Sequence, residues 1–145
     1  MKLEEELKHE FVTPQQRVTT NIIFTSNWLL NKIANALKPT DLSFQQLNVL
    51  SILKGQPGKT ATVNLIKDRL IDRMPNVSRL VNKLMEKGLI EKERNSTDQR
   101  VVYIKLTVKG EKSREEGRKI INDGIINFTN EQADSLNTLM EQLRK

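Results

Sequence analysis

Residues 75–88 read PNVSRLVNKLMEKG and carry apolar side chains at helical spacing. The apolar positions recur every three or four residues, as in a helix that buries one side; they are Val77, Leu80, Val81 and Leu84. Pro75 suits a first helical position, and Gly88 suits the position just beyond a helix end. The stretch therefore predicts an amphipathic helix that starts at Pro75 and ends before Gly88.

The outward face of this helix carries side chains suited to reading base edges in DNA. The candidate major-groove contacts are Asn76, Ser78, Arg79 and Asn82. Asn can form two hydrogen bonds with adenine, Arg can form two with guanine, and Ser can bond bases or phosphates. An ordinary solvated helix face more often carries Glu and Lys pairs, so we expect this face to enter the major groove.

A shorter helix is expected just before it, over residues 61–70, with Thr60 as its N-cap. The link between the two helices, around residues 71–74, has about four residues, which is the spacing of a helix-turn-helix. The second helix of that motif, over residues 75–87, would be the recognition helix.

Two extended runs follow, over residues 89–93 and 101–106, with the polar segment Asn95–Arg100 between them. Such segments normally use glycine to reach positive φ, but none occurs from Asn95 to Gln99. A hairpin after a recognition helix is a wing, and a wing commonly inserts a basic residue into the minor groove, here Arg100. Asp98 can orient that guanidinium through a charge-assisted pair, or close the turn by bonding its own downstream backbone, and the two roles can coexist. Candidate phosphate contacts are Thr60, Thr62, Lys83, Lys92 and Arg94.

The outer parts of the chain read as helices. Leu3, Leu7 and Phe11 share one helical face, and Thr13-Pro14 begins a long helix that Pro39 ends. Ser43 opens a further helix, which Gly55 closes. After the wing, Thr107 caps a helix that runs to about residue 127, and Thr129 caps the last one. Glycines at 110, 117 and 124 recur every seven residues, and we expect them to permit close helix packing.

Composition narrows the class of protein. A chain of 145 residues fits one domain. It has no cysteine and one histidine, which argues against disulfides, thiol chemistry and a His-rich metal site. We find no nucleophile–base pair and no phosphate-binding glycine loop, so no enzyme activity, metal or cofactor is expected. There is no apolar run long enough to span a membrane and no signal-peptide pattern, so a cytoplasmic protein is expected.

The charge is unevenly placed. Residues 59–112 hold 13 Lys and Arg against 7 Asp and Glu, so the whole net charge of +6 lies within them. Positive charge confined to the segment with the predicted helix-turn-helix and wing indicates a module that binds a polyanion.

Three motifs together resemble the MarR family of bacterial winged-helix transcriptional regulators. They are the run from Val77 to Lys92, the pair Asp98-x-Arg100, and Leu106-Thr-x-x-Gly110. The resemblance covers nearly the whole chain and implies a mainly α fold with a small β-hairpin wing. Met74-Pro75 departs from the family pattern, which often has small polar residues there, and Pro offers no backbone N–H to a phosphate.

The resemblance also implies a homodimer on a pseudo-palindromic DNA site. It divides the chain into a helical dimerisation region, residues 1–38 and 108–145, and a winged helix-turn-helix lobe, residues 41–107. Expected dimer-interface residues are Leu3, Leu7, Phe11, Ile125, Leu136, Met140 and Leu143. By position, the recognition helix reads the major groove, and Asp98 and Arg100 form the wing tip.

Members of that family often sense small phenolic or anionic molecules in a crevice beside the dimerisation helices. Phe24, Trp28 and Phe44 are the candidate lining residues, and core packing is the open alternative for all three. The expected function is a sequence-specific transcriptional regulator, with repression favoured, tuned by a small aromatic or anionic effector. The alternative is a winged-helix protein-interaction module without DNA binding, against which the concentrated positive charge argues.

Overall fold

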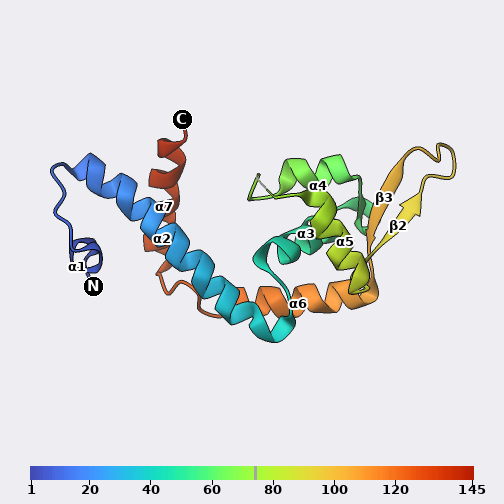
Figure 1. Cartoon of the computed structure of the whole chain (residues 1–145), viewed down its shortest axis with the longest axis horizontal. Helices are drawn as coiled ribbons and strands as arrows, with labels where there is room; N and C mark the ends of the chain where they lie inside the picture. The colour runs from blue at the N-terminus through green and yellow to red at the C-terminus, as the bar shows by residue number, and fades with distance from the viewer. Residues whose placement is uncertain (74) are drawn as a thin grey trace.

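The computed structural model describes residues 1–73 and 75–145, so the predicted departure at Met74 lies outside the described residues. The chain is mainly helical, with one small antiparallel sheet, as the sequence predicts (Figure 1). Its helices are α1 Leu3–Leu7, α2 Pro14–Leu37, α3 Phe44–Lys54, α4 Val63–Arg69, α5 Val77–Glu86, α6 Val108–Asn122 and α7 Asn130–Leu143. Short 3-10 turns, η1 Lys38–Thr40 and η2 Pro57–Lys59, follow α2 and α3.

The sheet has the strand order β1-β3-β2, with β1 Thr60–Ala61, β2 Ile90–Arg94 and β3 Val102–Leu106. In the hairpin, Ile90 lies opposite Leu106 and Arg94 opposite Val102. β1 was not predicted. It corrects the assignment of Thr60 as a helix cap, because Thr60 pairs with Lys105 and Ala61 is buried beside Ile104. Thr62 is the N-cap of α4, and its Oγ1 accepts from Leu65 N at 3.2 Å.

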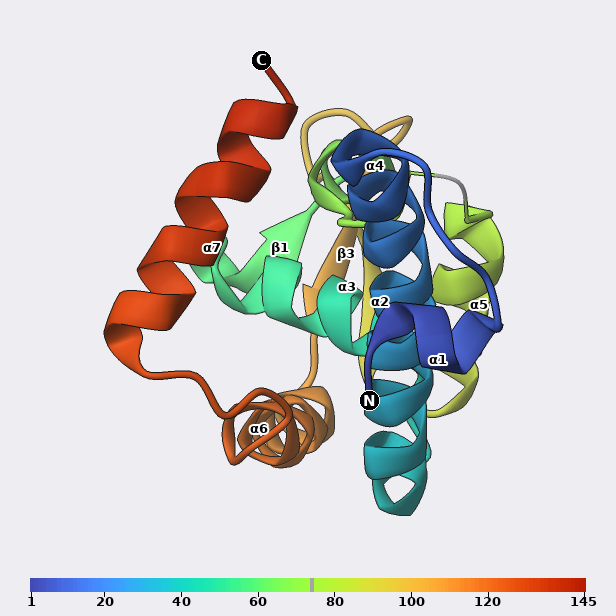
Figure 2. The ribbon, with the colours of Figure 1, turned by 90° about the vertical axis from the view of Figure 1, so that its left-hand side faces the viewer.

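The core lies where α3, α4, α5 and the sheet meet the C-terminal part of α2 and α6. Its most buried side chains are Leu37, Leu47, Val49, Leu50, Leu53, Ile66, Leu84 and Ile104. Figure 1 shows this lobe on one side and α1, α7 and the N-terminal part of α2 on the other. In Figure 2, α7 stands apart from α1 and α2, and no residue of α7 is buried.

Two of the three spaced glycines permit close packing, as predicted. A Cβ at Gly110 would lie 2.0 Å from the carbonyl oxygen of Leu89, and one at Gly117 would lie 2.9 Å from Leu47 Cδ1. Gly124 does not, because α6 ends at Asn122, before the predicted residue 127, and Gly124 turns the chain with a φ of 121°.

Several helix boundaries are confirmed, and those of α1 and α5 are corrected. Thr13, Ser43, Thr107 and Thr129 each accept a capping bond at the start of the predicted helix. The helix expected to reach Phe11 ends at Leu7, because Lys8 takes the left-handed conformation with a φ of 50°. Helix α5 begins at Val77 and not at Pro75, since its N-cap is Asn76.

Candidate nucleic-acid interface

Helix α5 has the two faces that its sequence predicts. Val77, Leu80, Val81 and Leu84 are buried in the core. Ser78, Arg79, Asn82 and Lys83 are exposed on the opposite side. The apolar stripe holds the helix against α3 and α4, so its polar face is presented as one surface.

Asn76 has a structural role at the start of this helix. Its Oδ1 accepts a hydrogen bond of 3.2 Å from Arg79 N, which satisfies one of the unpaired N–H groups of the first turn. A bidentate contact with adenine would use the same amide oxygen. Asn76 is therefore both a cap and a candidate base contact, and the sequence alone predicts only the second role.

The end of α5 leads directly into the wing. Gly88 has a φ of 71°, its N–H donates to Met85 O at 2.9 Å, and Leu89 N donates to Leu84 O at 3.0 Å. This is a Schellman motif, which stops the helix and redirects the chain within two residues. Gly88 thus takes the predicted position, and β2 begins two residues later.

The wing tip is closed by side chains and not by a glycine. Asn95 Oδ1 accepts from Thr97 N at 2.8 Å, from Thr97 Oγ1 at 2.6 Å and from Asp98 N at 3.3 Å. Asn95 N in turn donates to Val101 O at 3.0 Å. All residues from Asn95 to Val101 keep a negative φ, which is why the segment needs no glycine.

Asp98 both closes the turn and binds Arg100, so the two predicted roles coexist. Asp98 Oδ1 accepts from Arg100 N at 3.0 Å and from Arg100 Nε at 3.1 Å, and Oδ2 accepts from Nη2 at 3.3 Å. The hydrogen bond from the Arg100 side chain, together with that from its backbone, lowers the pKa of Asp98 below its ordinary value. Arg100 nevertheless has 92% of its side chain exposed. Its guanidinium is bonded to Asp98 through Nε and Nη2, while most of the side chain remains in solvent.

The candidate phosphate contacts differ in what they already bind. Arg94 Nη1 donates to Gln99 O at 2.8 Å, so this side chain links strand β2 to the wing tip. Thr62 caps α4, and Thr60 Oγ1 bonds Pro57 O at 3.4 Å. Lys83 and Lys92 are exposed.

The three aromatic residues of the predicted crevice lie in different environments. Phe44, in the first turn of α3, packs against the core. Trp28 on α2 is half exposed, and Lys32 Nζ lies 5.0 Å from its ring centroid. Lys32 also donates to Ile125 O at 2.9 Å, which links α2 to the segment between α6 and α7. Phe24 is partly exposed on the same helix as Trp28.

The predicted dimer-interface residues also differ in their exposure within one chain. Leu3 and Ile125 are buried within the single chain, whereas Leu7, Leu136 and Leu143 are exposed. Sequence reasoning did not assign a further set of large exposed apolar residues to an interface: Val18, Ile23, Leu30, Ile126, Phe128 and Leu139. Their exposure could not be read from spacing, because it depends on α7 standing away from α2.

Within the described part of the chain, no group of three or more His, Cys, Asp or Glu residues is arranged to hold a metal. No helix among the described residues is long and apolar enough to cross a membrane.

Comparison with protein families gives a match over residues 31–123 to the transcriptional regulators SarA/Rot. This match covers the end of α2, the whole lobe and α6, and so includes every candidate DNA contact described above.

Similar folds occur among solved structures. An organohalide-sensing transcriptional regulator, RdhR-CbdbA1625, in its 2,4-dichlorophenol-bound form matches with a TM-score of 0.79 at 22% identity, over 92% of this chain and 80% of that one. A mutant of MarR from E. coli, complexed with operator DNA, matches with a TM-score of 0.75 at 21% identity, over 99% of both chains. Sco3205, a MarR family transcriptional regulator from Streptomyces coelicolor in complex with DNA, matches with a TM-score of 0.71 at 20% identity, over 94% of this chain and 89% of that one. The fold is the MarR winged helix.

Proposed function

The chain belongs to the SarA/Rot family of transcriptional regulators, and we propose that it is a homodimeric repressor that binds a pseudo-palindromic DNA site. The observation that carries this proposal is the exposed polar face of α5 beside a wing that presents Arg100. Two solved proteins of the same fold are complexed with DNA. In this proposal the protein acts in the cytoplasm and is not an enzyme.

The recognition helix fits the groove in length and in chemistry. A helix of ten residues is about 15 Å long, and a helix fits the roughly 12 Å width of the major groove. In this proposal Arg79 reads guanine, Asn82 reads adenine, and Ser78 bonds a base edge or a phosphate. Asn76 adds a contact through its amide N–H groups while its oxygen keeps the cap.

The wing would lie along the adjacent minor groove. There Arg100 would enter the groove, where negative potential is concentrated when the groove is narrow. Lys83 and Lys92 would bind phosphates, and Arg94 would keep the wing in shape. Positive charge in residues 59–112 supports this assignment over a protein-interaction module.

The apolar surface that one chain leaves exposed supports the proposed homodimer. Leu136, Leu139 and Leu143 lie exposed along α7, and Ile23 and Leu30 lie exposed on α2. Large exposed apolar side chains that gather on one face of a helix are typical of an interface. A second copy would cover it, and the two-fold symmetry of the dimer would match a pseudo-palindromic site.

A small aromatic or anionic effector would bind beside Phe24 and Trp28, with Lys32 as its cationic partner. Lys32 already bonds the segment after α6, so a ligand that competes for its ammonium would act on the connection between α2 and α6. The similar fold of a regulator bound to 2,4-dichlorophenol supports the chemical class.

Fluorescence anisotropy with duplex fragments from the promoter of its own gene tests the proposal. Affinity should fall steeply as salt rises, because bound Lys and Arg displace counterions from phosphates. Lys145→Ala removes a positive charge far from the wing, because the C-terminus lies at the other end of the molecule (Figure 1). This variant should show the same salt dependence as the unsubstituted chain. Binding that is absent, or that does not depend on salt, would favour the protein-interaction module instead.

A further inference from the structure

The C-terminal end of the recognition helix is attached to the start of α6. Lys109 Nζ donates to Lys87 O at 2.9 Å, and Thr107 Oγ1 donates to Gly88 O at 2.7 Å. Thr107 N bonds Leu89 O at 3.2 Å, and the missing side chain of Gly110 lets α6 approach that same carbonyl. These contacts fix one point of α5 against α6.

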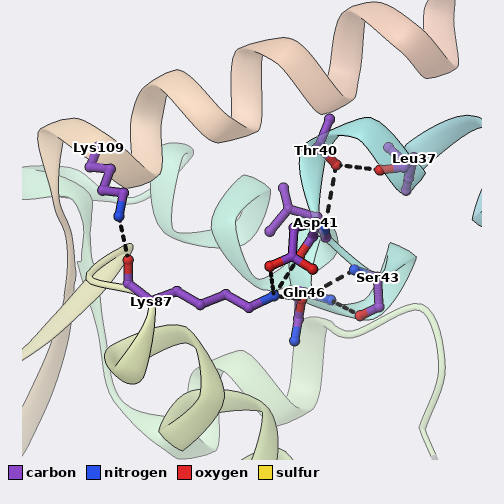
Figure 3. Close-up of polar contacts among 8 residues, drawn as sticks. Leu37, Thr40, Asp41, Ser43, Gln46, Lys87 and Lys109 are labelled. Atoms are coloured by element: carbon purple, nitrogen blue, oxygen red, sulfur yellow. Dashed lines mark hydrogen bonds and ion pairs between the residues drawn. The ribbon is translucent and has the colours of Figure 1, made fainter.

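The Lys87 side chain extends to a second point, the joint between α2 and α3 (Figure 3). Its Nζ donates to the backbone oxygen of Asp41 and, at 3.2 Å, to Gln46 Oε1. The Asp41 carboxylate lies 3.6 Å away. A lysine of a DNA-binding helix would by default be assigned to a phosphate, but here the ammonium is turned into the protein and the side chain is 30% exposed.

The acceptors at this joint are held in place by their own bonds. Gln46 is 6% exposed, and its Oε1 also accepts from Ser43 N at 3.1 Å, which makes it part of the cap of α3. Thr40 Oγ1 donates to Leu37 O at 2.7 Å and accepts from Leu42 N at 3.2 Å, so it ties the end of α2 to the next segment. Asp41 itself has a φ of 54°. Lys87 therefore bonds to a joint that is already ordered.

We propose that Lys87 is a positioning residue that sets the angle of the recognition helix relative to α2. The apolar stripe packs α5 against α3 and α4, and the Lys87 bonds add a direct link from the end of α5 to the joint that follows α2. In a dimer built through α2 and α7, the angle of each α5 determines the spacing of the half-sites that both helices can reach together. The inference rests on the proposed function for its consequence on DNA, but not for the bond that carries it.

The positioning role can be measured without DNA. Because the chain has no cysteine, spin labels can be placed at two exposed sites, Asn31→Cys on α2 and Ser78→Cys on α5. Labelled chains are diluted into unlabelled ones so that only distances within one chain are recorded. Lys87→Met should broaden the distance distribution, whereas Lys87→Arg, which keeps charge and donors, should leave it narrow. Gln46→Met removes the acceptor instead and should broaden it too, which keeps the test decisive if Lys87→Met does not fold.

DNA binding gives the second readout. Lys87→Met should lose about tenfold in affinity at the best half-site spacing, on the scale of one lost hydrogen bond to a charged group. It should also discriminate less among duplexes whose half-sites are moved by single base pairs, with an unchanged salt slope. Lys83→Met, by contrast, should lower the slope by about 1, as expected for one lost phosphate contact.

Two results would overturn the inference. One is a distance distribution in Lys87→Met and Gln46→Met identical to that of the unsubstituted chain. The other is a lower salt slope in Lys87→Met with spacing discrimination intact, which would make Lys87 a phosphate contact. If the unsubstituted chain binds no duplex, the proposed function fails, and the label distances still decide whether Lys87 positions α5.

Discussion

Asp98 binds Arg100 through three hydrogen bonds of 3.0 to 3.3 Å, yet Arg100 is more than twice as exposed as its partner, with 92% of the side chain in solvent against 41%. A guanidinium that is oriented by a carboxylate and still exposed to solvent is suited to entering a groove in one orientation. The carboxylate that holds it also carries a negative charge that phosphates repel.

These two effects predict different outcomes for the two residues. Arg100→Ala should weaken binding to the operator by about 1–3 kcal/mol, the range of one lost groove contact. Asp98→Asn keeps an oxygen for the Arg100 N–H but removes the charge, so the ratio of affinities for operator and unrelated duplex should fall. Anisotropy titrations with both duplexes measure this ratio, and Gln99→Ala is the control at the wing tip. An unchanged ratio in Asp98→Asn would show that the carboxylate does not orient Arg100.

Arg79 should determine sequence preference. Arg79→Ala should cost about 1–3 kcal/mol on the preferred operator and little on an operator changed at the base pair that Arg79 reads. Binding to a set of single-base-pair variants locates that position. Glu86→Ala, exposed in the last turn of the same helix, should leave the preference unchanged. Uniform loss across all variants would make Arg79 a phosphate contact.

Gly110 should contribute to the stability of the fold. Its Cβ in Gly110→Ala would lie 2.0 Å from the Leu89 carbonyl oxygen, so the start of α6 would have to move away from the end of α5. We expect a loss of more than about 2 kcal/mol in the free energy of unfolding, measured by urea denaturation. Gly55→Ala is the matched control, since the new Cβ would meet its nearest atoms at 3.6 and 3.7 Å. A folded Gly110→Ala with unchanged stability would contradict the packing described here.

Glu111 gives a dependence of stability on pH. It binds Lys54 and Lys59, and these two hydrogen bonds lower its pKa from 4.5 to about 2. A carboxyl whose folded-state pKa is lowered stabilises the protein above its unfolded-state pKa and loses that contribution as pH falls through the folded-state value.

Glu111→Gln should therefore be less stable than the unsubstituted chain above pH 4.5, and the difference should shrink between pH 4.5 and about 2. Denaturation at several pH values measures it. Glu115→Gln, exposed on the same helix, is the control. A difference that grows as the pH falls would contradict the assignment of these ion pairs.

The exposed apolar surface of α7 should hold the dimer together. Leu139 is 64% exposed in the single chain, so Leu139→Lys should not disturb the fold but should place a charge in the interface. Sedimentation at micromolar concentration should give the mass of a monomer for this variant and of a dimer for the unsubstituted chain. Thr138→Lys adds the same charge about 100° around the helix from Leu139, away from the face that Leu136 and Leu143 share, and should remain dimeric. A monomeric unsubstituted chain would refute the proposed assembly.

The sequence predicts those parts of the structure that depend on neighbouring residues. The stripe from Val77 to Leu84, the Thr13 and Thr107 caps and the Gly88 helix end are set by local spacing and backbone chemistry, and all are confirmed. Strand β1 was missed because two residues carry no periodic pattern, and its pairing with β3 depends on residues more than forty positions away. The predicted cap, Thr60, lies in that strand, and the cap of α4 is Thr62.

In the candidate site, too, the features that depend on neighbouring residues could be predicted and those that depend on distant residues could not. Exposure of Ser78, Arg79 and Asn82 follows from helical spacing, and the Asp98–Arg100 pair follows from two residues of opposite charge in one turn. The inward direction of Lys87 could not be predicted, because it depends on where the joint at Asp41 and Gln46 lies in space. From its sequence neighbours, Lys87 is one more cation near DNA.

The closure of the wing tip by Asn95, Thr97 and Asp98 also bears on how such a regulator can be redesigned. Since the turn is specified by these side chains and by backbone groups, Ser96 and Gln99 are exposed positions whose side chains can be exchanged while the loop keeps its conformation. A library varied at these two positions would sample new contacts along the DNA on an unchanged scaffold.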